Sequence, residues 1–187
     1  MLAVDYDEPG GPEVLKLKEI NIPDISKDEV LIKVKSAGVN RPDIIQREGN
    51  YPAPPGHSKT LGLEVSGIIE KVGTNVKKFL VGDKVAALVN GGGYAEFCKA
   101  NESLVFHIPK NITFNEAACI PECFFTAWSN IVMRGEIKKN QKILIHGGTS
   151  GVGIASIQIA KLFDSYIITT VGNKEKVSFC KKLGVDK

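Results

Sequence analysis

The residues best placed to do chemistry form a glycine-rich turn between an apolar strand and a helix-forming segment. The strand at 142–146 runs into the turn at 147–153, and a second apolar segment at 154–162 follows at once. Backbone N–H groups at a helix start lack intrahelical partners, and the helix dipole adds partial positive charge there. Glycines let the backbone approach phosphate oxygens closely. We therefore predict a dinucleotide pyrophosphate site formed by Gly148, Thr149, Ser150, Gly151, Val152 and Gly153.

One position of the turn departs from the strict Gly-x-Gly-x-x-Gly pattern. Ser150 occupies the place of the middle glycine, between Gly148 and Gly153. A serine hydroxyl at that place can still donate a hydrogen bond to a phosphate. A tight glycine turn without a ligand remains an alternative, although the order of strand, turn and helix favours the nucleotide.

The end of the second apolar strand, at 166–171, carries information about the cofactor. In sites that prefer NAD, an acidic residue near this point binds the ribose 2′-hydroxyl. No acid ends the strand here, and the chain continues with a small polar residue between glycine and lysines. A 2′-phosphate would be attracted by such a turn, so we favour NADP(H), held by Gly172, Asn173 and Lys176. Glu175 argues against this choice, and the lysines can also be the solvated first turn of the next helix.

Two parts of the chain with different sequence patterns must fold to position these residues. The first half has short alternating runs separated by glycine and proline, at 14–18, 29–36, 64–72 and 84–89, which predict antiparallel strands of a partly open barrel. Helical spacing becomes clear only over 115–134, where Thr113 or Asn115 can cap the helix. We predict a β domain at 1–120 and an α/β nucleotide-binding domain at 121–187.

Composition narrows the class of protein. The chain has 187 residues, 43% of them hydrophobic and 24% charged, with a net charge of +3. This balance gives no reason to expect a nucleic acid or membrane partner, and no segment resembles a membrane span or signal peptide. The cysteines are too few and scattered for a disulfide scaffold, so we expect reduced thiols and a cytoplasmic location. They are Cys98, Cys119, Cys123 and Cys180.

An ordered series of motifs resembles one family over the whole chain. The motifs lie at 10–15 (GGPEVL), 37–43 (AGVNRPD), 51–56 (YPAPPG), 61–67 (LGLEVSG), 82–85 (GDKV), 92–97 (GGYAEF), 121–122 (PE) and 126–128 (TAW), followed by the glycine turn. Together they resemble the N-terminal part of the medium-chain dehydrogenase/reductase superfamily, in its quinone oxidoreductase (zeta-crystallin-like) branch. The resemblance implies a GroES-like β-barrel domain followed by the first half of a doubly wound Rossmann domain.

Members of this superfamily differ in whether they bind a catalytic zinc ion. Its alcohol dehydrogenases hold a catalytic zinc with cysteine, histidine and cysteine, and the motifs align those positions with Asn40, Leu63 and Glu122. Leucine has no ligand atom and an amide is a poor zinc ligand. Cys119 and Cys123 can share one face of a helix, but no second pair of ligands accompanies them. We therefore expect no metal site.

The resemblance also implies the residues of the active-site cleft. Asn40 and Tyr51 would lie beside the nicotinamide, where Asn40 donates to a ribose hydroxyl or a quinone oxygen and the flat Tyr51 ring suits a planar substrate. Asp43 would orient Asn40. Alternatively, Asn40 and Asp43 cap the short helix that starts at Pro42, and Tyr51 anchors a loop. Thr126 corresponds to a family residue that touches the nicotinamide carboxamide or ribose, unless it is an ordinary helix threonine.

These features imply an NADPH-dependent hydride transfer to a quinone or another α,β-unsaturated carbonyl, without zinc. Zinc-free enoyl reduction remains an alternative, although the stretch at 51–56 favours quinone. The chain ends just after the second helix of the nucleotide-binding fold, so only strands 1 and 2 of its sheet are expected. Two origins remain open: a fragment of the parent enzyme, or a truncated homologue that acts as a binding or interaction module. Full-length members of the family usually form homodimers.

Overall fold

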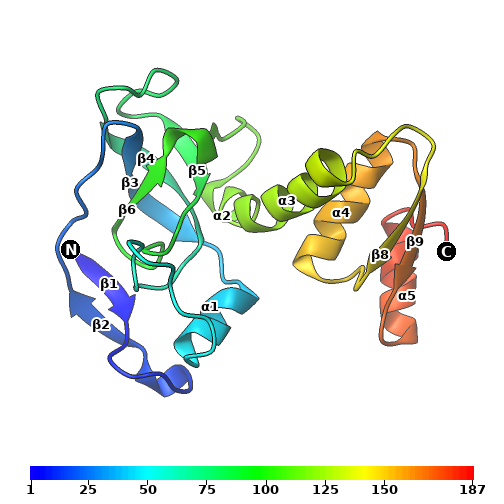
Figure 1. Cartoon of the computed structure of the whole chain (residues 1–187), viewed down its shortest axis with the longest axis horizontal. Helices are drawn as coiled ribbons and strands as arrows, with labels where there is room; N and C mark the ends of the chain where they lie inside the picture. Colours follow the sequence, from blue (N-terminus) through cyan, green and yellow to red (C-terminus); the bar gives the residue numbers. More distant parts are fainter. The chain divides into compact units, whose positions relative to one another are not determined.

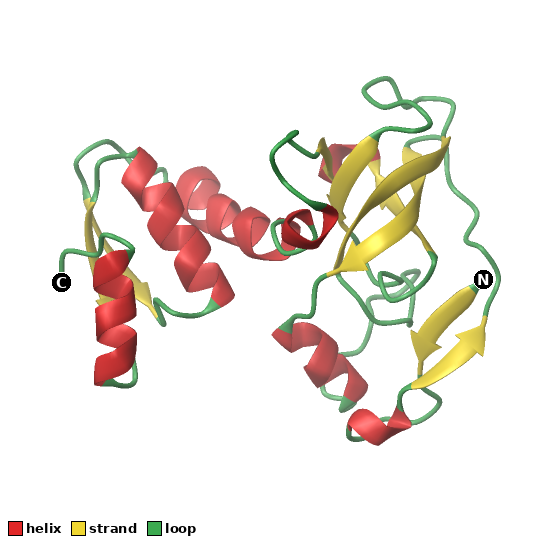
Figure 2. Cartoon of the chain, turned by 180° about the vertical axis from the view of Figure 1, so that it is seen from behind, coloured by secondary structure: helices red, strands yellow, loops and turns green.

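The computed structural model describes all 187 residues, which form two compact units, Met1–Glu122 and Cys123–Lys187 (Figure 1). The first unit is built around one antiparallel sheet of five strands in the order β6-β3-β4-β5-β7. Figure 2 shows these strands twisting strongly, as in a partly open barrel. The strands are β3 (Glu29–Ala37), β4 (Glu64–Val72), β5 (Lys84–Leu88), β6 (Phe97–Asn101) and β7 (Val105–His107).

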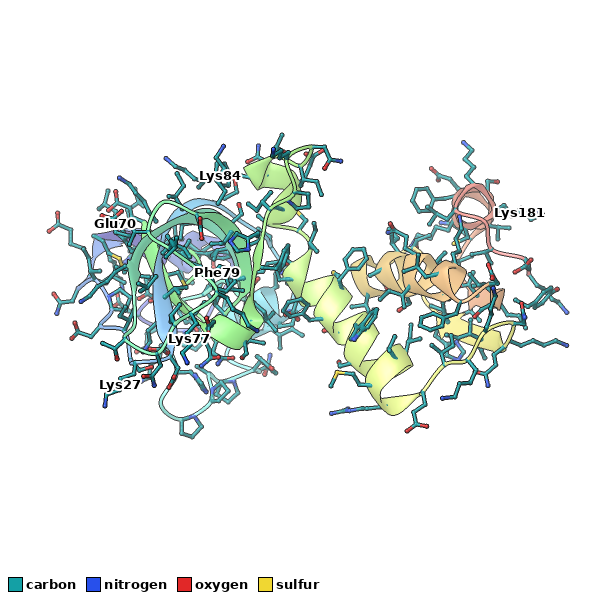
Figure 3. All side chains as sticks on the ribbon, turned by 90° about the horizontal axis from the view of Figure 1, so that it is seen from above. Lys27, Glu70, Lys77, Phe79, Lys84 and Lys181 are labelled. Carbon is teal, nitrogen blue, oxygen red and sulfur yellow. The ribbon has the colours of Figure 1, made fainter.

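The hydrophobic core of this unit lies on the inner face of the sheet. Alternate residues of the central strands point inward, so Ile32 of β3 sits opposite Ile69 of β4 and both are fully buried. Phe79, from the turn between β4 and β5, fills the same core. Figure 3 shows Phe79 within the curled sheet, with Lys27 and Glu70 at its outside. The sheet therefore gives a rigid frame to the loops at its ends.

Smaller elements complete the first unit. β1 (Leu2–Asp5) pairs with β2 (Lys16–Glu19), and α1 (Arg41–Arg47) follows β3. The structure corrects the predicted strand at 14–18, because η1 (Pro12–Val14) is a 3₁₀ turn and the strand begins only at Lys16. Proline fixes the backbone in a helical conformation at the first position of this turn. The sequence patterns also missed β1, β6 and β7. A further 3₁₀ turn, η2 (Glu102–Leu104), links β6 to β7.

The helix predicted over 115–134 is interrupted. It consists of α2 (Phe114–Ala117), α3 (Pro121–Trp128) and a π-helical segment, η3 (Ser129–Arg134). Pro121 has no N–H to donate, so α2 cannot continue through it, and it serves instead as the first residue of α3. Thr113 caps α2 by accepting a hydrogen bond from the backbone of Glu116 at 3.3 Å. No helix of the chain is long and apolar enough to cross a membrane.

The second unit contains a parallel pair of strands. β8 (Lys142–His146) pairs in register with β9 (Tyr166–Thr170). The connecting helix α4 (Gly151–Leu162) begins three residues earlier than predicted, and α5 (Lys174–Lys182) follows β9. Both helices bury side chains in one cluster with the strands, including Ile157 of α4 and Cys180 of α5. The strand–helix–strand unit predicted around the glycine turn is therefore present, and β9 is the only strand that pairs with β8.

We expect Ile32→Ala to lower the free energy of unfolding of the first unit by about 2–5 kcal/mol, because it leaves a cavity in a fully buried site. Urea unfolding followed by circular dichroism measures this change. The matched control is Leu80→Ala, whose side chain is 72% exposed and whose loss should change stability by less than about 0.5 kcal/mol. Equal effects of the two variants would contradict the assignment of this core.

Candidate functional site

The glycine turn of the second unit has the geometry of a helix cap. Gly147 has a φ of +70°, a conformation that favours glycine. Ser150 is the N-cap of α4: its hydroxyl accepts a hydrogen bond from the Gly153 N–H at 3.0 Å and donates to the Gly147 carbonyl at 2.8 Å. The Ser150 proton is therefore already donated within the turn. The N–H groups of Gly151 and Val152, in the first helical turn, have no intrahelical acceptor.

Close packing explains why glycine occupies these positions. A Cβ on Gly148 would lie 2.3 Å from the Thr169 hydroxyl oxygen, and one on Gly153 would lie 2.3 Å from the Gly147 carbonyl oxygen. A methyl group fits neither place, so the turn lies directly against β9 and against its own helix. Ser150, Gly151 and Val152 at the start of α4 are exposed, so their N–H groups lie at the surface. The residues present therefore fit a phosphate group.

The turn after β9 is polar and open. Asn173 is the N-cap of α5 and accepts a hydrogen bond from the Lys176 N–H at 2.9 Å. A Cβ on Gly172 would meet nothing within 4 Å, and the side chains of Lys174 and Lys176 are exposed. Both readings of the sequence are compatible with this turn, because the lysines do lie in a solvated first helical turn and stay available to an anion.

Thr126 lies in the second unit on α3, one helical turn after Cys123. A Cβ on Gly151 would lie 2.6 Å from the Cys123 sulfur, so α3 passes close to the first residue of α4. Ala127 of α3 and Ala155 of α4 are buried in one cluster, which fixes this contact. Residues three apart share a helix face, so Thr126 lies on the side of α3 that carries Cys123.

In the first unit, Asn40 and Asp43 meet at the start of α1. Asn40 is the N-cap residue, and the Asp43 carboxylate accepts a hydrogen bond from its backbone N–H at 2.8 Å. Asp43 also accepts from the Gly62 N–H at 3.1 Å and the Tyr94 hydroxyl at 2.9 Å, and it is 2% exposed. Asp43 therefore fixes the backbone of Asn40 and does not hold its side chain. This agrees with the alternative that the two residues cap the helix.

The Asn40 side chain is held by a residue that sequence reasoning missed. The Glu64 carboxyl at the start of β4 accepts a hydrogen bond from the Asn40 amide Nδ2 at 2.8 Å. Its other oxygen accepts from the backbone N–H of Glu122, in the first turn of α3, at 2.9 Å. Gly38 makes room for this group, since a Cβ there would lie 2.1 Å from a Glu64 oxygen. One buried carboxyl thus joins the starts of two helices.

We call this group of residues the Glu64 network; its members are Asn40, Asp43, Glu64, Tyr94 and Glu122. Burial is the main influence on the pKa values of Glu64, Tyr94 and Glu122. Burial is the main cause that raises the pKa of Glu64, with Asp43 adding to it and the two donated hydrogen bonds opposing it. Burial also raises the pKa of Glu122, followed by the negative charges of Glu64 and Asp43. Burial and the neighbouring Asp43 raise the pKa of Tyr94, which therefore keeps its proton.

Tyr51 is not part of this network. It lies in the segment between α1 and β4, its side chain is 47% exposed, and no hydrogen bond joins it to Asn40 or Asp43. The structure therefore brings together two of the three predicted catalytic residues. Glu64 and Tyr94 stand within the motifs LGLEVSG and GGYAEF, so the sequence did contain a signal for them, namely polar residues inside glycine-rich motifs.

A separate cavity of about 270 Å³ lies elsewhere in the first unit. It is lined by residues that include His57, Ser58, Val89 and the buried Cys98, and by none of the predicted site residues. Burial raises the pKa of Cys98 to about 12, which keeps this thiol protonated. No three side chains of histidine, cysteine, aspartate or glutamate converge in the chain as metal ligands do.

Known proteins resemble the chain over nearly its full length. Residues 26–110 match the model of the alcohol dehydrogenase GroES-like domain. The human quinone oxidoreductase is 38% identical over 177 residues, which are 94% of this chain and 54% of that protein. The chain therefore spans about half the length of the curated relatives it matches.

Solved structures resemble the chain equally well. The crystal structure of the CurK enoyl reductase matches 99% of this chain and 58% of its own, with a TM-score of 0.89 and 29% identity. The mycobacterial protein Rv1454c, solved in complex with NADPH, matches 100% of this chain and 57% of its own, with a TM-score of 0.85 and 34% identity. These likenesses confirm the predicted fold class, a GroES-like partly open barrel followed by α/β elements. The chain is therefore similar to the N-terminal part of the quinone oxidoreductase branch of the medium-chain dehydrogenase/reductase superfamily.

Proposed function

We propose that this chain carries the substrate-side residues and the first cofactor-binding elements of an NADPH-dependent quinone oxidoreductase that works without zinc. The observation that carries the proposal is the Glu64 network. By the resemblance of the motifs, Asn40, Leu63 and Glu122 align with the positions where the alcohol dehydrogenases hold their zinc. In this chain Leu63 has no ligand atom, and the Asn40 amide is bonded to Glu64.

The glycine turn supports the cofactor side of the proposal. The N–H groups of Gly151 and Val152, next to the predicted contacts Gly148, Thr149, Ser150 and Gly153, would bind the pyrophosphate. Gly172, Asn173 and Lys176 would receive the 2′-phosphate, since no acid ends β9. Thr126 would meet the nicotinamide end. Bound NADPH would supply the hydride, and the similar mycobacterial protein was solved with this cofactor.

The Glu64 network supports the acceptor side. Asn40 keeps one amide N–H and its carbonyl oxygen beyond the bond to Glu64, so it can donate to a quinone oxygen as negative charge grows there. Because Glu64 and Asp43 together fix the side chain and the backbone of Asn40, this donor is preorganised. A quinone is already a good electron acceptor and needs less activation than a simple ketone. Tyr51 is proposed as a movable aromatic surface for the flat ring, consistent with its exposure.

An enoyl reductase is the second candidate, because a solved enoyl reductase has a TM-score of 0.89 with this chain. Both reactions use the same hydride donor and differ in the acceptor, a quinone or an α,β-unsaturated thioester. The test uses the longest reading frame that contains these residues. NADPH oxidation is followed with each acceptor class in turn, and turnover of the thioester alone would favour the second candidate.

We expect Lys176→Ala to weaken NADPH binding by about 3- to 10-fold and to leave NADH binding unchanged, because only NADPH carries the 2′-phosphate. Fluorescence of the single tryptophan, Trp128, in a titration of the chain measures both affinities. The control is Lys181→Ala, an exposed lysine at the other end of α5 (Figure 3). A parallel loss of NADH affinity would argue against a phosphate site at this turn.

We expect Asn40→Ala to lower quinone turnover by about 100-fold with little change in the KM for NADPH, because the variant loses a donor to the acceptor oxygen. It should also lower the free energy of unfolding by about 1–3 kcal/mol, since one buried oxygen of Glu64 loses its partner. Steady-state kinetics and urea unfolding measure the two effects. The exposed Asn111→Ala serves as the control. Unchanged turnover in a destabilised Asn40→Ala protein would reduce Asn40 to a structural cap.

A further inference from the structure

Reduction of a quinone requires a proton as well as a hydride, and the Glu64 network contains three carboxyl groups. Asp43 accepts three hydrogen bonds, from two backbone N–H groups and the Tyr94 hydroxyl. Each oxygen of Glu64 accepts a hydrogen bond from a donor, Asn40 on one side and the Glu122 backbone on the other. All four carboxyl oxygens of Asp43 and Glu64 are therefore occupied by donors.

Glu122 is different. Its carboxyl group is half-buried in the first turn of α3 and accepts no hydrogen bond. A helix start ordinarily favours a carboxylate. Here burial and the facing carboxyl groups, Glu64 from β4 and Asp43 from α1, together raise the pKa of Glu122, and no lysine or arginine offsets them. Hydrogen bonds donated to a carboxylate favour its charged form, and Glu64 has such donors while the Glu122 carboxyl has none, so protonation is easier at Glu122 than at Glu64.

The backbone of Glu122 also lies next to the residue proposed to face the acceptor. The Asn40 amide and the Glu122 N–H bind the two oxygens of one carboxyl group, at 2.8 and 2.9 Å. A carboxyl group has its oxygens about 2 Å apart, so Asn40 and the first turn of α3 are neighbours through Glu64. The other proton of the network belongs to the Tyr94 hydroxyl, which donates a hydrogen bond to Asp43.

We propose that Glu122 is the catalytic acid of the reaction, the group that gives a proton to the acceptor oxygen after hydride transfer. This inference rests on the proposed function. The quinone takes up the hydride, with its electron pair, and becomes a hydroquinone monoanion. The Glu122 O–H bond then breaks, an O–H bond forms on the anionic oxygen, and the neutral hydroquinone leaves. The Glu122 carboxylate regains its proton from solvent, which reaches it because the side chain is only half-buried.

The first test measures the proton itself and requires no cofactor. In the chain labelled with ¹³C at the glutamate carboxyl groups, NMR titration should show Glu122, assigned by Glu122→Gln, titrating at higher pH than the exposed Glu70 of β4. Glu64→Gln should move the Glu122 titration toward that of Glu70, because it removes the facing charge. A Glu122 signal that titrates together with Glu70 in the unchanged chain would overturn the proposal.

The second test uses the longest reading frame and two quinones, one giving a weakly acidic and one a strongly acidic hydroquinone. We expect Glu122→Gln to lower kcat/KM for the first quinone by about 100-fold or more and for the second much less, because the second product leaves as an anion. The unchanged protein should lose activity as the pH rises through the pKa of Glu122, and Glu122→Gln should lack this dependence. Glu70→Gln serves as the matched control (Figure 3).

The outcomes separate the two proposals. If the unchanged protein oxidises NADPH with quinones and Glu122→Gln has the same rate and pH profile, Glu122 is not the acid and the proposed function stands. If the unchanged protein reduces neither quinone, the proposed function is wrong and the role of Glu122 falls with it. Equal losses with both quinones would also overturn the proposal, because they indicate a structural effect of the substitution.

Discussion

The buried carboxyl group of Glu64 is the interaction on which the site of the first unit depends. It accepts hydrogen bonds from the Asn40 side chain and the Glu122 backbone, and thereby joins the ends of strands β3 and β4 to the first turns of α1 and α3. Burying a carboxyl group without a cation is costly unless its oxygens are bonded. The glycine at 38 is a consequence, because any side chain there would collide with the Glu64 oxygens.

The barrel explains why such a network can form. Its core is made by alternate apolar residues of five antiparallel strands, so the sheet is rigid and the loops at its ends start from fixed points. Asp43 uses this frame by binding the loop backbone at Gly62 and the ring hydroxyl of Tyr94. Polar groups that come from four separate stretches of sequence thus reach one place, and each buried oxygen of the two acids has a donor.

The glycine turn of the second unit is built mainly from backbone groups, whereas the site of the first unit is built from side chains. Gly148 and Gly153 bring strand, turn and helix into direct contact, and Ser150 satisfies its own cap. The serine that breaks the glycine pattern therefore has a structural role in the helix start. What the turn can offer an anion is the set of N–H groups that every helix leaves free at its first turn. This arrangement suits a phosphate, as proposed above, without any charged side chain in the turn.

The sequence by itself determined the elements whose patterns are local. Alternation located β3, β4 and β5, the strand–turn–helix order located the glycine turn, and the motif series identified the family. Pro12 and Pro121 mark the two breaks in the sequence, but the alternating pattern starts within the turn that Pro12 opens and the helical pattern runs across Pro121. Only the tertiary structure decided which polar side chain holds Asn40, since Glu64 is 24 residues away and reaches it through the pairing of β3 with β4. The same holds for Glu122, whose environment is made by charges from α1 and β4. Hydrogen bonds and burial of this kind depend on distances in space, and no local spacing of residues encodes them.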